Sequence, residues 1–254
     1  MTLLLPALLY LSAAVFLGGV GWRLFKWLRT PVPLNIVLTP APKTTLGVAQ
    51  RLAWELFGFR SLFKADPSLW IPSWLFHVSL VFLAVGHLGG LVIPKFAETT
   101  LGLNENQFER LAQVSGGAIG ILAVTALLWL LVRRLAAERV RWISTFSDYF
   151  ALALLLLILA TGNQMRFMGG LDIVQARQFV SGWLMLHPVA PPNNPMFAVH
   201  VLLVCALLIY IPFSKLVHIG GATLFSPTLN QRNDPRDRRH IGPWNAVPAA
   251  AKSK

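Results

Sequence analysis

The stretch Trp74–Pro94, WLFHVSLVFLAVGHLGGLVIP, decides the fold of this chain. Its 21 residues include two histidines, His77 and His87, but no Lys, Arg, Asp or Glu. A helix of roughly 20 predominantly apolar residues is long enough to cross the hydrocarbon core of a bilayer. The stretch therefore predicts a membrane-spanning helix that carries two ionisable side chains into the membrane.

The composition of the whole chain is that of a membrane protein. Of its 254 residues, 55% are hydrophobic and 13% are charged, whereas soluble domains carry about 25% charged residues. This balance excludes an ordinary soluble enzyme and a disordered chain. We expect an all-α integral membrane protein, with a five-helix bundle over residues 1–225 and a polar, basic tail over 226–254. The five stretches long and apolar enough to span a bilayer are 3–22, 74–94, 113–132, 150–168 and 196–217.

The net charge of +12 is distributed unevenly between the loops. The loops 23–73 and 133–147 and the chain from Lys215 onward hold 18 Lys and Arg, whereas the loops 95–112 and 165–195 hold four. Under the positive-inside rule, this difference places the N-terminus outside and the C-terminus in the cytoplasm. Membrane topology thus accounts for the basic balance, and we expect no nucleic-acid partner.

The first span and the loop after it carry two further signals. Basic residues follow the span and none precedes it, the reverse of a secretory signal, so we expect a retained helix. In the cytoplasmic loop 23–73, apolar residues recur at spacings of three and four from Val48 to Phe63. This pattern predicts an amphipathic helix that lies on the inner membrane surface or docks a cytoplasmic partner.

Four of the six histidines fall in or at the ends of two spans. Ionisable residues in a membrane are expensive and indicate function by default, although a single one can be a neutral ring bonded to a neighbouring helix. The two spans run in opposite directions, which pairs His87 with His200 near the outer face and His77 with His218 near the inner face. His200 and His218 are 18 residues apart, so a continuous α-helix would present both from one face.

Two facing imidazoles are the axial ligand set of a b-type haem. Zinc is a poorer fit, because each pair offers two nitrogens and no nearby Cys or carboxylate. A proton relay would need acidic partners at membrane depth, and the nearest carboxylate, Asp148, lies at the mouth of the fourth span. The single cysteine, Cys205, excludes a disulfide, an iron–sulfur cluster and covalent c-type haem within the chain. We therefore predict two b-type haems that carry electrons across the bilayer.

Glycines near the predicted ligands have two interpretations. Gly86, next to His87, would leave room for a macrocycle, as would its neighbours Gly89 and Gly90 and the third-span residues Gly116, Gly117 and Gly120. The same residues also fit close helix packing of the small-xxx-small type. Both interpretations can hold at once.

These residues resemble the nitrate reductase gamma subunit family of di-haem cytochromes b. The matching segments are Phe76-His77, Gly86-His87 ten residues later, SGGA at 115–118, the basic turn 133–141, and IPFSKLVH at 211–218. The resemblance implies that His87 and His200 bind the outer haem and that His77 and His218 bind the inner haem.

Two features depart from that family's pattern. Its quinol site has a lysine before the third span, whereas the matching position here is Phe108, with Arg110 two residues on. Arg110 is therefore a candidate quinone contact. The tail over 225–244 resembles the relatives called DsrM, the membrane cytochrome of the sulfite-reductase-associated DsrMKJOP complex. The DsrM resemblance implies electron exchange between a quinone pool (menaquinone or ubiquinone) and a cytoplasmic iron–sulfur subunit resembling heterodisulfide reductase.

The sequence thus predicts a multi-pass electron-transfer subunit of a quinone-linked oxidoreductase complex in a bacterial or archaeal cytoplasmic membrane. We see no nucleophile–base pair or phosphate-binding loop, so we expect no catalytic residue of its own. Two alternatives stay open: the gamma subunit of a respiratory nitrate reductase, and a haem-free membrane anchor or proton-conducting subunit. Arg166, at the outer end of the fourth span, is either an interfacial anchor or a partner of a haem propionate.

Overall fold

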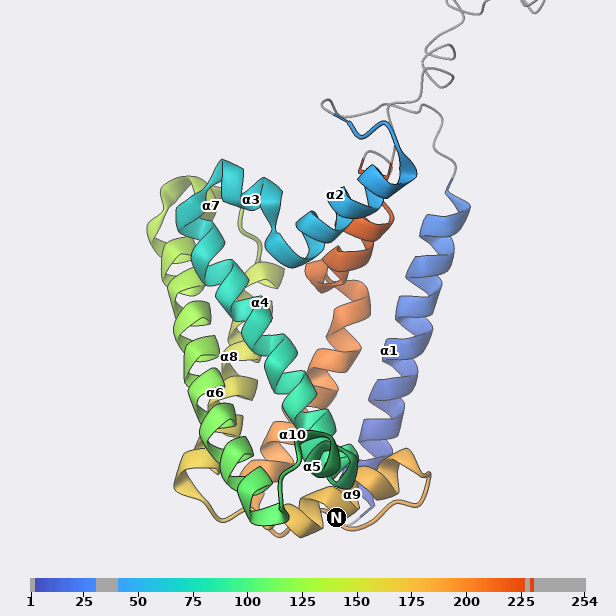
Figure 1. Cartoon of the computed structure of the whole chain (residues 1–254), viewed down its shortest axis with the longest axis vertical. Coiled ribbons are helices and arrows are strands. Elements are labelled where there is room, and N and C mark those ends of the chain that lie inside the picture. The colour runs from blue at the N-terminus through green and yellow to red at the C-terminus, as the bar shows by residue number, and fades with distance from the viewer. Residues whose placement is uncertain (1–2, 31–40, 227–228, 231–254) are drawn as a thin grey trace, which may run out of the picture. The chain divides into compact units, whose positions relative to one another are not determined.

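The computed structural model describes residues 3–30, 41–226 and 229–230 and groups the chain into two compact units. The first unit comprises Met1–Gly19 and Asp66–Ser214, and the second Val20–Ala65 and Lys215–Lys254. Every element among the described residues is a helix (Figure 1). Five are long and apolar enough to cross a membrane, as predicted: α1 (Leu4–Arg29), α4 with the π-helix η1 (Pro67–Val92), α6 (Glu105–Ala136), α8 (Phe146–Met168) and α10 with η2 (Pro195–Phe213).

Polar caps start the long helices outside their apolar runs. Helix α6 begins eight residues before the predicted span, because Asn104 and Gln107 form a capping box. Thr145 and Asp148 cap α8 in the same reciprocal way. Hydropathy shows which residues suit hydrocarbon, whereas the caps determine where a helix starts. The first four predicted spans are therefore shorter than the helices.

In the first unit, the helices α4, α6, α8 and α10 pack in that order, each against the next (Figure 1). The first turns of α1 pack on α10 and on the short helix α9 (Ile173–Leu184) through Leu5, Phe179 and Phe197. A second core, between α4, α6 and α8, includes Phe76 and Leu127. The shorter helices complete this unit: α5 (Pro94–Leu101) and α7 (Glu138–Trp142).

The second unit contains the amphipathic stretch, and that stretch is helical as predicted. It forms α2 (Thr45–Gly58) and α3 (Arg60–Ala65), which are separated at Phe59, where φ is 49° and the backbone is left-handed. Trp27, from the end of α1, packs closely against Gly220 of the π-helix η4 (Ile219–Leu224). The membrane side of this unit stays a prediction. Most of the predicted tail, 231–254, lies outside the described residues.

The fifth span differs from the prediction, because it is not a continuous α-helix to residue 217. Helix α10 (Pro195–Tyr210) gives way to the 3-10 helices η2 (Ile211–Phe213) and η3 (Lys215–Val217). Pro212 explains the change, since proline has no N–H and its ring clashes with the carbonyl four residues earlier. The premise of the register argument, one continuous α-helix from His200 to His218, is therefore wrong, and the placement of both on one face stays a prediction. His218 belongs to the second unit.

Candidate functional site

The first unit brings His87, at the end of α4, and His200, on α10, close enough to interact electrostatically. His87 Nδ1 lies 2.6 Å from the carbonyl oxygen of Leu83, and His200 Nδ1 lies 2.8 Å from Thr161 Oγ1. A carbonyl only accepts, so Nδ1 of His87 carries the proton and Nε2 carries the lone pair. A histidine in that tautomer binds a metal through Nε2. This predicted pair therefore has the donor chemistry of two axial haem ligands.

The other two predicted ligands lie in different units. His77 is half-buried on α4, where its Nδ1 is 2.7 Å from the Ser73 carbonyl oxygen. It precedes His87 by ten residues of continuous α-helix, a rise of about 15 Å. His218 is in the second unit, with Nδ1 3.1 Å from the Lys215 carbonyl oxygen. The pairing of His77 with His218 stays a prediction.

The glycines fall into two groups. Beside His87, a Cβ added to Gly86 or Gly90 would meet nothing within 4 Å. On α6, a Cβ at Gly116 would lie 3.1 Å from the Arg166 guanidinium, and one at Gly120 would overlap the Asn163 side chain. The α6 glycines thus serve close packing against α8, whereas Gly86 and Gly90, beside His87, have open space next to them. The donor set and the space both fit the predicted haem at this pair.

Gln113 connects two arginines that the sequence singled out separately. Arg166 Nη1 donates to Gln113 Oε1 at 3.0 Å, and Gln113 Nε2 donates to the Arg166 carbonyl at 2.8 Å. Gln113 also lines a cavity of about 420 Å³ with Asn106, Glu109 and Arg110. Phe108, at the position of the family's lysine, is buried, so Arg110 is the cation at this cavity. Gln113 is not among the residues that the sequence analysis singled out.

Arg177, on α9, ties the same cavity to the chain just after His87. Its Nε donates to the Gly90 carbonyl oxygen at 2.9 Å, and its Nη1 lies 3.5 Å from Glu109 and 4.0 Å from Glu105. Gly90 belongs to η1, the π-helix that follows His87 directly (Leu88–Val92). Single π turns are frequent at functional sites. The cavity and the π-helix after the predicted haem ligand are therefore joined by one half-buried arginine that the sequence did not identify.

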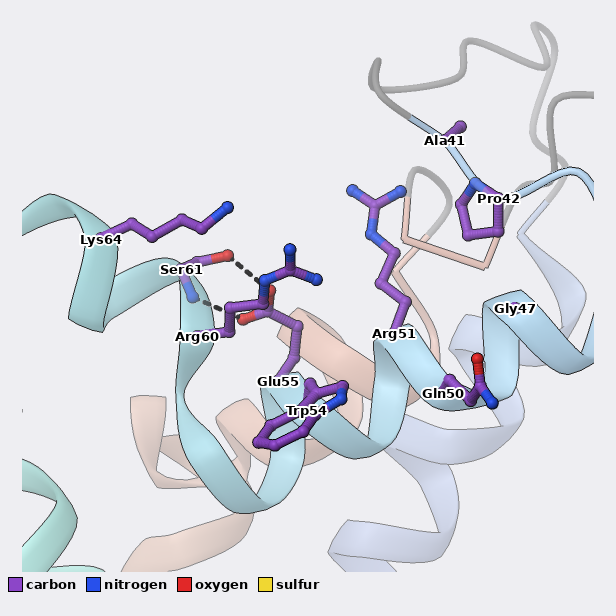
Figure 2. A pocket seen from close by; sticks show the side chains of 10 residues that line it. All are labelled: Ala41, Pro42, Gly47, Gln50, Arg51, Trp54, Glu55, Arg60, Ser61 and Lys64. Atoms are coloured by element: carbon purple, nitrogen blue, oxygen red, sulfur yellow. Dashed lines mark hydrogen bonds between the residues drawn. The ribbon is translucent and has the colours of Figure 1, made fainter.

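The second unit has a separate cavity of about 400 Å³ between α2 and α3 (Figure 2). Arg51, Arg60 and Lys64 give its lining a cationic character. Glu55, which also lines it, accepts hydrogen bonds from the backbone and hydroxyl of Ser61 at 3.0 and 2.7 Å. This cavity contains none of the predicted site residues.

Five helices long and apolar enough to span a membrane define the class: a multi-pass membrane protein, in which two of the predicted histidine ligands come from different helices. Within the described residues, no three His, Cys, Asp or Glu side chains gather as a metal centre. The model of the nitrate reductase gamma subunit family matches residues 45–228. The chain belongs to this family, which confirms the resemblance found in the sequence.

Relatives with assigned names match the chain over different lengths. An Hdr-like menaquinol oxidoreductase cytochrome b-like subunit of Archaeoglobus fulgidus is 34% identical and covers 96% of this chain and 84% of its own length. The subunit of the same name from Archaeoglobus profundus is 31% identical and covers 95% of this chain and 82% of its own length. The nitrate reductase gamma chain of Bacillus subtilis is 31% identical over 60% of this chain and 72% of its own. Similarity to the Hdr-like subunits thus extends beyond the segment shared with the nitrate reductase chain.

Proposed function

We propose that this chain is the di-haem b membrane subunit of a quinone-linked oxidoreductase complex. In this proposal His87 and His200 hold the outer haem, and His77 and His218 hold the inner one. A haem with both axial positions filled supplies a one-electron carrier. The chain exchanges electrons between the quinone pool and a cytoplasmic iron–sulfur subunit, and other subunits of the complex carry the catalytic chemistry.

The observation that carries the proposal is the His87–His200 pair. The two rings come from α4 and α10, close enough for His87 to affect His200 electrostatically, and each Nδ1 lies within hydrogen-bonding distance of a partner, the Leu83 carbonyl or the Thr161 hydroxyl. Open space beside Gly86 adds room for a macrocycle. The uneven distribution of Lys and Arg supports the proposed orientation, with this pair toward the outside.

The cavity lined by Arg110 and Gln113 is the proposed quinone contact. It adjoins the polar network that reaches Gly90, close to His87, and it offers both a cation and an amide to a quinone oxygen. Arg166 supports this site from α8 through Gln113. The names of the Archaeoglobus relatives favour menaquinol as the donor or product.

The partner system is proposed from the tail and from the degree of identity. An Hdr-like relative is 34% identical over 96% of the chain, whereas a nitrate reductase-like relative is 30% identical over 90% of it. The extent of similarity therefore does not separate the two systems, and the DsrM-like tail is what supports a sulfite-reductase-associated complex over a nitrate reductase.

The proposal is tested by counting haems in the purified protein. A reduced-minus-oxidised spectrum with pyridine extraction should give two b-type haems per chain. His87→Ala and His200→Ala should each leave one, because the outer haem loses an axial ligand. His187→Ala is the matched control: this exposed histidine, outside the predicted pairs, should be replaceable with both haems retained.

Each alternative has its own result. A colourless wild-type protein would support the haem-free anchor or proton-conducting subunit. Two haems in His87→Ala would remove that residue from the ligand set. Purification of the native complex distinguishes the two oxidoreductases: an iron–sulfur partner without nitrate-reducing activity supports the sulfur-linked complex, and a nitrate-reducing partner overturns it.

A further inference from the structure

His200 differs from the other three predicted ligands in how its ring is held. The Nδ1 atoms of His77, His87 and His218 lie within hydrogen-bonding distance of a backbone carbonyl three or four residues earlier in the chain. His200 Nδ1 instead lies 2.8 Å from the hydroxyl of Thr161, which is 39 residues away on α8. The orientation of this ring therefore depends on a side chain of a neighbouring helix.

The Thr161 hydroxyl is arranged to accept a hydrogen bond from that ring. Its Oγ1 lies 2.9 Å from the carbonyl oxygens of both Leu157 and Ile158, so its own proton is directed to the α8 backbone. A hydroxyl that donates in this way still has lone pairs, and it accepts from Nδ1–H of His200. Thr161 is only 9% exposed, so water has little access to compete for the bond.

We propose that Thr161 is a positioning residue for His200. It fixes the Nδ1-protonated tautomer and the plane of the ring, which makes Nε2 the ligand atom. This inference rests on the proposed function, because it takes His200 as an axial haem ligand.

The bond also affects the chemistry of the ligand. A hydrogen bond from Nδ1–H raises the basicity of the other ring nitrogen. A more basic axial nitrogen favours the oxidised iron, so Thr161 lowers the reduction potential of the haem held by His87 and His200. For the other three histidines the acceptor is a backbone carbonyl, which no substitution removes. At His200, which also interacts with the Ile158 backbone, the hydrogen bond to Thr161 is made by a side chain that can be changed.

The test compares three variants of the full-length protein. Thr161→Val removes the hydroxyl and keeps the branched shape, whereas Thr161→Ser keeps the hydroxyl. Thr125→Val is the matched control, because Thr125 on α6 makes the same backbone hydrogen bond, 2.9 Å to Ile121, on an exposed face. The readouts are the haem content, the midpoint potential of each haem and the low-spin electron paramagnetic resonance g-values.

Thr161→Val should shift one haem to a higher potential, change its g-values, and weaken its retention by about tenfold, the lower end for a lost partner of a metal ligand. The second haem should stay unchanged. Thr161→Ser should remain near wild type, and Thr125→Val should be indistinguishable from it. Wild-type potentials and g-values for both haems in Thr161→Val would overturn the proposal.

Two further outcomes keep the test decisive. If Thr161→Val does not accumulate, pulsed electron paramagnetic resonance of the wild type measures the coupling of the remote ring nitrogen, Nδ1, of each of the four histidines. The coupling of His200 should differ from the other three, because its Nδ1–H donates to a hydroxyl instead of a carbonyl. Four equal couplings would overturn the proposal. Failure of the proposed function is recognised separately, by a wild type without haem or by two haems in His200→Ala.

Discussion

The first residues of α4 are held by charge and hydrogen bonds, whereas its last residues pass into a π-helix, and two glycines there have open space next to them. At the start, Asp66 accepts from the backbone N–H of Leu69 at 3.0 Å and pairs with Arg133 of α6 at 2.9 Å. At the end, an added Cβ on Gly86 or Gly90 would touch nothing within 4 Å. Helix α4 thus has one end anchored by Asp66 and another end with open space beside His87. The difference indicates where a bound group fits.

The largest expected effect comes from replacing a closely packed glycine, Gly120, and a glycine with open space beside it, Gly86, by leucine. Leucine at Gly120 would be forced into Asn163 where α6 packs on α8, and overpacking of a close interface costs about 1–3 kcal/mol. Leucine at Gly86 has space, so it should cause no overpacking and should lower the haem content instead, with any change in the thermal midpoint following from the lost haem. Thermal unfolding in detergent and pyridine extraction on both variants measure the two effects.

The comparison would fail if Gly120→Leu kept the thermal midpoint of the wild type and Gly86→Leu kept both haems. A stable Gly120→Leu would show that α8 does not pack there as described. A Gly86→Leu protein with two haems would show that the space beside His87 is not used.

A smaller effect is expected at Arg177. Replacing it with methionine removes the hydrogen bond to the Gly90 carbonyl and the pairing with Glu109, and losing a hydrogen bond from a half-buried charged group costs about 1–3 kcal/mol locally. Amides of 88–93 should then exchange with solvent about tenfold faster, with little change in the rest of α4. Hydrogen exchange read by mass spectrometry measures this. Arg139→Met, at an exposed position of α7, is the control; equal protection in both variants would remove Arg177 from the support of η1.

Much of the fold was predictable because it depends on local signals. Apolar run length gave five spans, and the motif around Phe76 and Gly86 gave the family. The chemistry of the site depends on distant residues: Thr161 reaches His200 across 39 positions, and Arg177 reaches Gly90 across 87. No spacing rule in a single sequence predicts such pairs. The break at Pro212 is different, since proline inside a predicted helix was a visible signal and the register argument for His218 passed over it.

The smallest expected effect concerns the anchored end of α4, and it depends on pH. Hydrogen bonds from Ser68 and from the backbone of Leu69, together with the nearby Arg133 guanidinium, hold the pKa of Asp66 below its usual range. The ionised form is therefore favoured in the folded state, so its stabilisation is present above the unfolded pKa of about 4 and is lost as the pH falls through the lower, folded value. Asp66→Asn should unfold at a slightly lower temperature than wild type at pH 6, and the difference should shrink toward pH 3.

The difference should stay small because both partners are partly exposed, and exposed ion pairs contribute little and are screened by salt. Thermal unfolding of wild type and Asp66→Asn at pH 6 and pH 3, at low and high salt, measures it. A difference that widened toward pH 3 would mean that Asp66 is protonated more readily in the folded chain than in the unfolded one, which contradicts its hydrogen bonds. A large difference at pH 6 would mean that this end supports the bundle as strongly as the packing of α6 on α8 does. The two ends of α4 would then differ only in the open space beside them, because both would contribute substantially to stability.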